Sequence, residues 1–370
     1  MRILQALEFN QFNTGSVHQM FQAAAGLRER GHEVAIASRP DPVLAAKAAE
    51  SGIDFQALPF RNSFDLGTIF ALRRLIAERR FDVIHAHKGV AHALALSATF
   101  GKPVGAFIVN RGVSFPLDRW NRGKYRTHRV DRIVTVCRQI KDVIVTSGRL
   151  PSDKVEVVYA GTDVALFDPT KWDPSAFRRE KGIGEDRFLV AQVGVRDWKG
   201  WKELIAAIAA VAPSHPEIHL ALVGCRNDGE KGDVTGFARE SGIGDRVSPV
   251  EYRTDMPSVL AACDLVVDAS WAGTGVTGTI REAMAMRKPV IATDCGGNRE
   301  LVSTREVGWL IAPQDSGAIA GAIRDVMGGP DRRNAVAARA MDHVRRSFSK
   351  ELRIGRLEDL YRSILARKRL

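Results

Sequence analysis

The hexapeptide GTGVTG (273–278) matches G-x-G-x-x-G, a pattern typical of loops that hold phosphate groups. It follows the apolar run DLVVDAS (264–270) and precedes a helical pattern. A glycine-rich turn between a parallel strand and a helix directs unpaired backbone N–H groups and the positive end of the helix dipole toward an anion. The pattern therefore predicts a phosphate-binding loop that contains Thr274, Gly275, Val276, Thr277 and Gly278. The alternative is a loop that only turns the chain.

Dinucleotide-binding domains carry the same pattern, but they place it at the end of their first strand. Here several strand–helix units of the second half precede the loop, and Trp271 and Ala272 separate it from the strand. Asp294 lies about 20 residues downstream, where such domains place a carboxylate for the ribose. The late position of the loop in its domain nevertheless argues against a nicotinamide or flavin site.

Two cations and one carboxylate are expected beside this loop. Arg196 and Lys199 follow the apolar run FLVAQVG (188–194), and loops after parallel strands share the carboxyl edge of the sheet. An arginine and a lysine at this edge suit a diphosphate, although either alone would be read as an exposed loop charge. Glu282 lies four residues after Gly278, where its carboxylate can accept hydrogen bonds from a ribose diol. Its alternative role is to stabilise the helix dipole, worth about 0.3–1 kcal/mol.

The elements that must position these residues form the same pattern twice. Apolar runs alternate with helical patterns in the first half, and the alternation restarts at FLVAQVG. Such alternation indicates parallel sheets covered by helices on both faces. We therefore predict an α/β protein with two doubly wound, Rossmann-like domains.

The predicted domain boundaries follow from composition. We expect an N-terminal domain at 1–165, a linker rich in Asp, Pro, Gly and charge at 166–186, and a second domain at 187–347. The segment 348–370 has helical periodicity, and we expect it to pack back on the first domain. Its apolar stripe consists of Leu352, Ile354, Leu357, Leu360, Tyr361 and Ile364.

Composition is that of a folded protein, with 45% hydrophobic and 26% charged residues among 370. No apolar run approaches the roughly 20 residues that span a bilayer. Four scattered cysteines without a C-x-x-C pair predict reduced thiols in a cytoplasmic protein. Neither a D-x-D motif nor a His/carboxylate cluster with ligand spacing is present in the sequence, so we expect neither a metal nor another cofactor.

Positive charge is concentrated in one part of the chain. The net charge is +11, and residues 101–150 hold eleven Lys and Arg against three Asp. The densest part, Arg119 to Arg132, could meet an anionic membrane surface or an acidic substrate, with a solvated basic face as the alternative. Since no nucleic-acid-binding motif accompanies it, we do not expect a nucleic-acid partner.

Several motifs, in this order, resemble the GT-B glycosyltransferases of family 4. In the second half they are VGVRDWKGWKELIAAI, LALVGCRND, DLVVDAS and TIREAMAMRKPVIATDCGGNREL. In the first half they are NTGSVHQMFQAAAGLRERGHEVAIAS, FDVIHAH and VEVVYAGTDVALFDP. The resemblance covers essentially the whole chain. It implies a retaining, metal-independent enzyme that binds a nucleotide sugar mainly in the second domain and an acceptor in the first, with a cleft closing between them.

The resemblance also implies roles for single residues. Arg196 and Lys199 would hold the donor diphosphate as catalytic cations, and Glu282 would hold the ribose. Gly15 from the first domain and Gly224 from the second are further donor-binding candidates.

Two departures from the family pattern lie around the sugar. Thr274 stands where the family usually has the first glutamate of its E-x7-E motif, and Asn110 and Arg111 stand where it often has a histidine. We predict that Arg111 contacts an anionic or polyhydroxylated acceptor, with a surface cation as the alternative. We also predict that His87, at the end of VIHAH, approaches a substrate, whereas a structural role is its alternative.

The sequence thus predicts transfer of a sugar from a nucleotide-diphosphate sugar to a glycan or lipid-linked glycan, as in cell-surface polysaccharide or lipopolysaccharide assembly. Positive groups aimed at the leaving diphosphate can supply much of the catalysis. Two alternatives stay open: a nucleotide-sugar 2-epimerase, and a nucleotide-sugar-binding protein with a degenerate sugar subsite. The loss of an acid at Thr274 counts against the epimerase. The base, the sugar and the acceptor are not specified by these residues.

Overall fold

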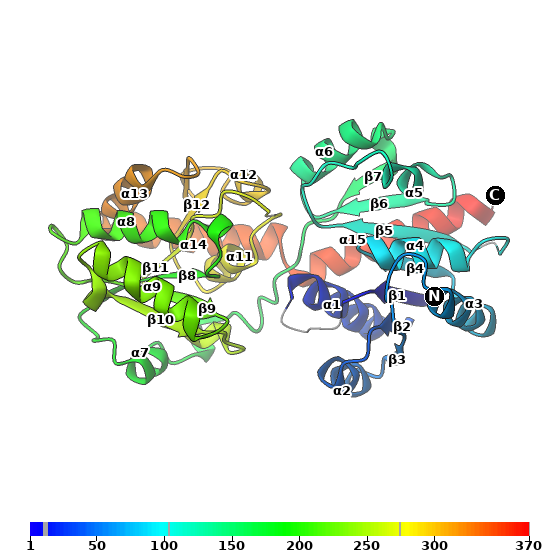
Figure 1. The fold of residues 1–370 in the computed structure, drawn as a ribbon, viewed down its shortest axis with the longest axis horizontal. Coiled ribbons are helices and arrows are strands. Elements are labelled where there is room, and N and C mark those ends of the chain that lie inside the picture. The colour runs from blue at the N-terminus through cyan, green and yellow to red at the C-terminus, as the bar shows by residue number, and fades with distance from the viewer. Residues whose placement is uncertain (10–13, 103, 274, 370) are drawn as a thin grey trace. The chain divides into compact units, whose positions relative to one another are not determined.

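The computed structural model describes residues 1–9, 14–102, 104–273 and 275–369, and it contains two compact units (Figure 1). Unit 1 comprises Met1–Gly161 and Lys350–Leu370, and unit 2 comprises Thr162–Ser349. Each unit is a parallel β-sheet flanked by helices. The predicted fold class, two doubly wound Rossmann-like domains, is confirmed.

Unit 1 contains a seven-stranded sheet with the order β3-β2-β1-β4-β5-β6-β7, in which every neighbouring pair is parallel. The order reverses between β1 and β4. The strands are β1 (Arg2–Leu7), β2 (Glu33–Ser38), β3 (Asp54–Ala57), β4 (Val83–His87), β5 (Ala106–Arg111), β6 (Arg132–Thr135) and β7 (Val155–Val157). The helices are α1 (Gly15–Glu29), α2 (Pro42–Glu50), α3 (Leu66–Arg79), α4 (Gly89–Ala98), α5 (Arg122–Arg126), α6 (Arg138–Gly148) and α15 (Lys350–Arg369).

The C-terminal helix α15 packs on unit 1, as the sequence predicted. Ile354, Leu357, Tyr361 and Ile364 are buried in the same hydrophobic core as residues of β1, β2 and α1. Glu358 on the same helix forms an ion pair with Arg30, with Oε2 2.9 Å from Nη1. The apolar stripe of α15 therefore serves as a cover for the unit 1 sheet.

Unit 2 contains a six-stranded parallel sheet with the order β10-β9-β8-β11-β12-β13. The strands are β8 (Phe188–Val193), β9 (Ile218–Cys225), β10 (Val247–Glu251), β11 (Leu265–Asp268), β12 (Val290–Thr293) and β13 (Trp309–Ile311). The helices are α7 (Ala176–Lys181), α8 (Trp201–Val211), α9 (Asp228–Glu240), α10 (Met256–Ala262), α11 (Gly278–Ala285), α12 (Asn298–Leu301), α13 (Ser316–Gly328) and α14 (Pro330–Ser347). The order reverses between β8 and β11, and open sheets of this kind bind ligands outside the carboxyl ends of the strands at such a reversal.

The segment 166–186, expected as a linker, is folded into unit 2. It contains α7, on which Phe177 and Arg178 are buried. The Arg178 guanidinium donates hydrogen bonds to the backbone oxygen of Ala262 and, over 2.7 Å, to the Asp264 carboxylate. These contacts attach α7 to unit 2, which begins at Thr162, before the Pro- and Asp-containing stretch.

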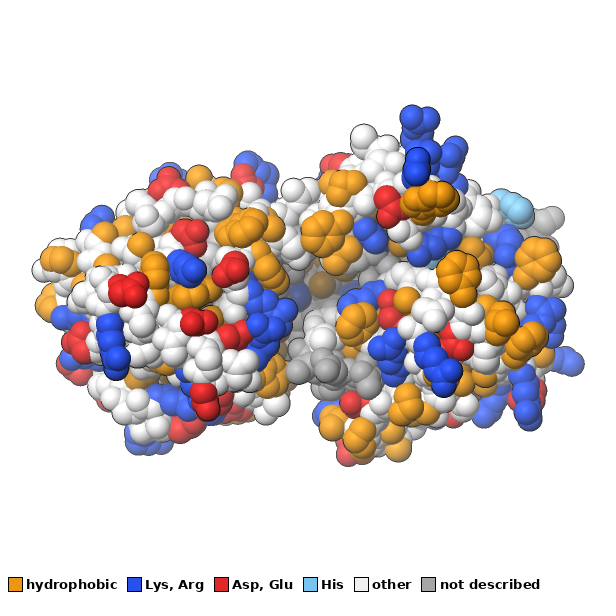
Figure 2. Space-filling view, viewed as in Figure 1, with side chains coloured by type: hydrophobic (Ala, Val, Ile, Leu, Met, Phe, Trp, Pro, Cys, Tyr) orange, Lys and Arg blue, Asp and Glu red, His pale blue; other side chains and the backbone are white. Residues whose placement is uncertain are grey.

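The surface of unit 1 exposes aromatic side chains among basic ones. Phe100, Phe115 and Trp120 are 72%, 62% and 80% exposed. Figure 2 shows hydrophobic side chains interspersed with Lys and Arg over the helices of this unit, on the right of the view. In the described part of the chain, no helix combines the length and the apolar character that a membrane span requires.

Candidate functional site

Two loops of unit 2 meet where its strand order reverses, one after β8 and one after β11. The buried side chain of Gln192, near the end of β8, joins them: its Nε2 donates to the backbone oxygen of Lys199 over 3.0 Å, and its Oε1 accepts from Ala269 N over 3.0 Å. Trp271 adds two more bonds, from its backbone N to Trp198 O and from Nε1 to Asp197 O. The two loops therefore form one structure at the carboxyl edge of the sheet.

Glycines allow these loops to approach each other closely. Gly200 has φ +66°, and a Cβ there would collide with the backbone of Ala269. Gly224, at the end of β9, has φ +99° and lies against Gly194, whose N donates to Val223 O. Gly224, a predicted donor-binding residue, is thus placed at the same edge as the loop after β8.

Lys199 lies beside a buried carboxylate that the sequence reasoning did not single out. Its Nζ is 3.6 Å from Oδ1 of Asp268, the last residue of β11, and the Asp268 side chain is only 4% exposed. The carboxylate also accepts hydrogen bonds from Ser270 Oγ (2.5 Å), Thr277 Oγ1 (2.8 Å) and Asn298 Nδ2 (3.0 Å). Burial acts to raise the pKa of Asp268, but the charge of Lys199 and these hydrogen bonds together hold it below its ordinary value. Asp268 is therefore an ionised group that positions the Lys199 ammonium.

The same network holds the loop that precedes α11. Asn298 Oδ1 accepts from Thr277 N over 3.3 Å and lies 2.8 Å from Thr277 Oγ1. Gly297 N donates to Gly275 O over 2.9 Å, and the Val276 side chain is buried. Thr277 directly precedes α11, which begins at Gly278. The backbone N–H groups in the first turn of an α-helix have no acceptor within the helix itself. The loop is thus held in place by its hydrogen bonds to Gly297 and Asn298, and the first N–H groups of α11 can still donate to an anion.

Glu282 lies one turn into α11 and is half-buried. A Cβ built on Gly278 would be 3.8 Å from Glu282 Oε1, so the carboxylate turns back toward the first turn of the helix. Burial raises the pKa of Glu282, and the charge of the adjacent Arg281 opposes this rise. Arg281 itself is buried and donates to Thr162 Oγ1 over 2.6 Å.

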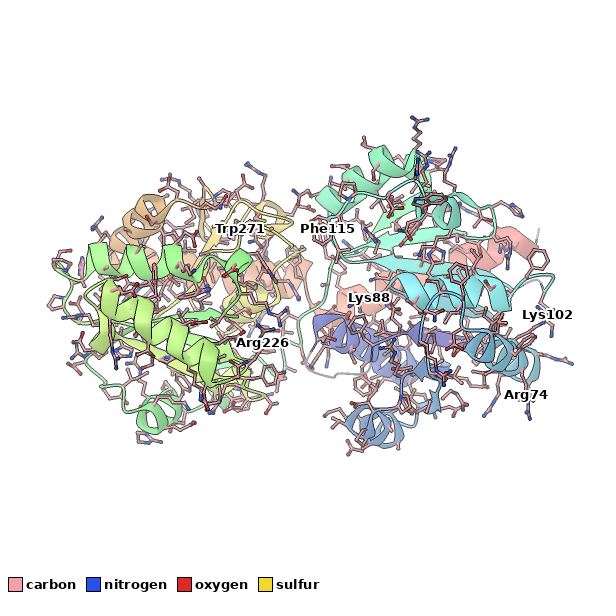
Figure 3. The ribbon with its side chains drawn as sticks, in the orientation of Figure 1. Arg74, Lys88, Lys102, Phe115, Arg226 and Trp271 are labelled. Atoms are coloured by element: carbon pink, nitrogen blue, oxygen red, sulfur yellow. The ribbon has the colours of Figure 1, made fainter. Side chains whose placement is uncertain are left out.

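Arg196 precedes the short turn Asp197–Lys199, and its side chain is exposed. Figure 3 labels two other side chains of this part of unit 2, Trp271 after β11 and Arg226 after β9. Arg226 is paired with Glu230 on α9 through Nε and Oε1, 2.6 Å apart. Thr274 lies outside the described residues, so the prediction for it stays a prediction.

The comparisons with known proteins match both halves of the chain. Residues 14–166 match the family model described as Glycosyltransferase Family 4, and residues 187–328 match the model described as Glycosyl transferases group 1. The lipopolysaccharide core biosynthesis mannosyltransferase LpcC of Rhizobium leguminosarum bv. viciae is 32% identical over 248 residues, which are 63% of this chain and 67% of that protein. The chain belongs to the family 4 glycosyltransferases.

Other relatives of this glycosyltransferase cover it from end to end. The Bacillus subtilis protein named putative glycosyltransferase YtcC is 23% identical over 371 residues, covering 96% of this chain and 89% of its own. The crystal structure of Anabaena HepE in complex with UDP has a TM-score of 0.85, with 22% identity and coverage of 98% and 100%. This second likeness supports the GT-B fold.

The remaining predicted residues of this glycosyltransferase belong to unit 1. Gly15 begins α1, and Arg111 ends β5. His87 ends β4 and is only 2% exposed; its Nε2 donates to Gln5 Oε1 over 2.7 Å. Burial lowers the pKa of His87 to about 3, with a further contribution from the charge of Arg353, so the ring is neutral at physiological pH. These contacts match the structural role that is the alternative for His87, and its approach to a substrate stays a prediction.

Among the residues that the structure describes, no three His, Cys, Asp or Glu side chains are grouped as metal ligands would be.

Proposed function

We propose that this glycosyltransferase moves a sugar from a nucleotide-diphosphate sugar to a glycan or lipid-linked glycan, with retention of the anomeric configuration. The observation that carries the proposal is the placement of Lys199, fixed beside Asp268, next to the anchored start of α11 at the strand-order reversal of unit 2. A cation and a helix N-terminus converge there, as a diphosphate requires.

In the proposed reaction, the bond between the anomeric carbon and the diphosphate oxygen breaks, and the acceptor hydroxyl oxygen bonds to that carbon. Negative charge grows on the leaving diphosphate, where Arg196, Lys199 and the N–H groups of α11 stabilise it. The proton of the acceptor hydroxyl passes to the leaving phosphate oxygen. Glu282 accepts hydrogen bonds from the ribose diol, and the reaction needs no metal because protein cations supply the positive charge.

The relatives support a nucleotide sugar and a surface glycan. HepE was crystallised with UDP, and LpcC is named a mannosyltransferase of lipopolysaccharide core biosynthesis. A nucleotide-sugar-binding protein remains the second candidate, because Thr274 takes the place of an acid that family members usually have near the sugar.

A nucleotide screen tests the first step. We expect one of UDP, GDP, ADP or CMP to raise the Tm of the full chain, since a ligand at 100 times its Kd stabilises the folded state by about 2.7 kcal/mol. Differential scanning fluorimetry measures this. If no nucleotide raises the Tm at millimolar concentration, the proposal that this protein binds a nucleotide sugar is wrong.

A matched pair of ligands tests the role of Glu282 in the same screen. The ribonucleotide should raise the Tm more than its 2′-deoxy form in the wild type. Glu282→Ala should remove this difference, whereas Glu230→Ala on α9, which pairs with Arg226, should keep it.

We also propose that the protein acts at the cytoplasmic face of a membrane through the basic segment from Arg119 to Arg132. Exposed Trp120 lies within this segment, with the Arg119 guanidinium 4.9 Å from its ring centroid. Anionic lipid headgroups attract clustered cations, and aromatic rings suit the interface between membrane and water.

We expect the protein to cosediment with phosphatidylglycerol vesicles at low salt, and we expect the double substitution Trp120→Ala and Arg122→Glu to weaken this binding. Equal sedimentation with phosphatidylcholine vesicles, or none at low salt, would disprove membrane binding by this segment.

A further inference from the structure

Unit 1 holds a second charged cluster, at the reversal of its own strand order between β1 and β4. Glu8 follows β1, Lys88 follows β4, and Arg111 is the last residue of β5. His87 and Asn110 are paired in the sheet, so the ends of β4 and β5 lie side by side. Lys124 on α5 joins the group, because its Nζ donates to Gly89 O, next to Lys88, over 3.0 Å.

The carboxylate beside the start of α4 is already engaged. Glu8 is 6% exposed, and its two carboxylate oxygens accept from Val90 N over 3.2 Å and Ala91 N over 3.1 Å. Glu8 therefore satisfies the first backbone N–H groups of α4, and the start of this helix is not itself an open anion site. What remains is an excess of positive charge, because the three cations Lys88, Arg111 and Lys124 are opposed by two carboxylates, Glu8 and Asp118.

Lys88 is held in a backbone conformation that suits glycine. Its φ of 65° and ψ of −175° fall in a region that residues with a side chain rarely adopt, and such strain persists where the surrounding structure imposes it. The side chain is half-buried, and its Nζ lies 3.6 Å from the centroid of the Phe9 ring. Figure 3 shows Lys88 at the start of α4. A lysine is thus kept at a strained position that a glycine would occupy more easily.

The neighbours of Lys88 have unused hydrogen-bonding capacity. Arg111 Nη2 donates to Phe115 O over 2.7 Å, but its buried Nε has no hydrogen-bond partner within the described ranges. The buried Oδ1 of Asn110 likewise has none there. Burial lowers the pKa of Lys124; the charge of Glu8 opposes this effect, that of Arg111 adds to it and that of Asp118 opposes it, so Arg111 and Lys124 lie close enough to repel each other. A bound anion would satisfy the unpartnered Nε–H of Arg111 and reduce the repulsion between the cations, whereas the Asn110 oxygen is an acceptor and needs a hydroxyl or another donor.

We propose that Lys88, Arg111 and Lys124 form a subsite for a phosphate group of the acceptor. That the phosphate belongs to the acceptor rests on the proposed function. That an anion binds at these residues does not. Three cations against the two carboxylates, Glu8 and Asp118, leave a net positive charge, which attracts a phosphate monoester that carries about −1.5 to −2 at pH 7. Arginine binds phosphate through a fork of donors, and the lysines act as compact charges.

Labelling with pyridoxal 5′-phosphate tests this subsite directly. The aldehyde condenses with a lysine amine with loss of water, and borohydride reduces the imine to a stable secondary amine that peptide mass spectrometry locates. We expect Lys88 or Lys124 to be labelled at about tenfold lower concentration than Lys102, a lysine of the same unit. Pyridoxal, which lacks the phosphate, should show less of this preference; an equal preference would mean reactive lysines without a phosphate site and would overturn the proposal.

Protection experiments distinguish two sources of the phosphate. If glycerol 3-phosphate and farnesyl phosphate protect Lys88 and Lys124 equally, the subsite recognises the phosphate alone, as on a soluble phosphorylated glycan. If farnesyl phosphate protects at about tenfold lower concentration, the acceptor is a lipid-linked phosphate. If neither protects, the subsite does not exist. Because labelling needs no nucleotide, this failure is distinct from a failure of the nucleotide screen.

Variants of Lys88 separate its strain from its charge. Lys88→Gly should have a higher Tm than Lys88→Ala, because only glycine adopts this backbone conformation without strain. Both variants should lose the protection of Lys124 by phosphate, whereas Lys102→Ala should keep it. Unchanged protection of Lys124 in both variants would overturn the proposed role of Lys88.

Discussion

Donor turnover by the Lys199→Ala variant is expected to fall by about 10²–10³ in kcat, the effect of removing one preorganised group that stabilises a developing negative charge. Lys199 Nζ is fixed 3.6 Å from Asp268 Oδ1, and its side chain is 16% exposed, so the ammonium is positioned before substrate arrives. Release of the nucleoside diphosphate, measured in a coupled assay, gives kcat and KM.

Lys202→Ala is the matched control, because it removes an exposed lysine at the start of α8 in the same unit. Its kcat should stay within about twofold of the wild type, since surface substitutions away from the site change free energies by about 0.5 kcal/mol or less. Lys199→Ala leaves Asp268 without its cation, so the Tm must be measured as well. Equal kcat for Lys199→Ala and Lys202→Ala would exclude a catalytic role for Lys199.

Asp268→Asn is expected to lower the free energy of unfolding by about 1–3 kcal/mol, the cost of leaving buried donors without an acceptor. The carboxylate accepts hydrogen bonds from Ser270, Thr277 and Asn298. In the asparagine variant an NH2 group replaces one carboxylate oxygen, so at least one of these donors would point at another donor. Asp294→Asn is the control, because Asp294 pairs with the exposed Arg299 and such pairs contribute about 0–1 kcal/mol. Urea denaturation at pH 7 compares them; equal destabilisation by the two variants would contradict the importance of the buried network.

The pH dependence of this difference has a defined sign. The pKa of Asp268 is lower in the folded chain than the ordinary value of 3.8, so ionised Asp268 stabilises the fold above the ordinary pKa. This stabilisation is lost as the pH falls below about 4 toward the folded-state pKa, because protons then bind the unfolded chain first. The stability difference between wild type and Asp268→Asn should therefore shrink below pH 4. A constant difference down to pH 3 would contradict an ionised Asp268.

The sequence predicts the placement of those candidate-site residues whose position depends on local order, and their roles stay predictions. The glycine loop, Lys199 and Glu282 could be predicted because each follows an apolar run or opens a helical pattern, and the carboxyl edge of a parallel sheet is set by that order. The back-packing of 348–370 followed from its apolar stripe in the same way.

The residues that hold the site in place could not be found in this way. Asp268 lies inside the apolar run DLVVDAS. An acidic residue within a run that predicts a buried strand was the only local sign that Asp268 has a special role. Its partner Asn298 is 30 residues further along the chain, and nothing in GGNREL marks it as the residue that anchors Thr277. Likewise His87 is covered within unit 1, where its neighbour His85 bonds the hydroxyl of Tyr361, 276 residues away. Such partners depend on tertiary packing, which periodicity does not encode.

The most direct test of the central claim is turnover of nucleotide-diphosphate sugars by the wild-type protein in the presence of EDTA. UDP-, GDP- and ADP-sugars are supplied with candidate phosphorylated acceptors, and NMR reads the anomeric configuration of the product. We predict release of the nucleoside diphosphate and a product with the configuration of the donor, both abolished to within background in Lys199→Ala/Glu282→Ala. Nucleotide binding without release from any donor would contradict a glycosyltransferase activity, and a product of inverted configuration would contradict retention.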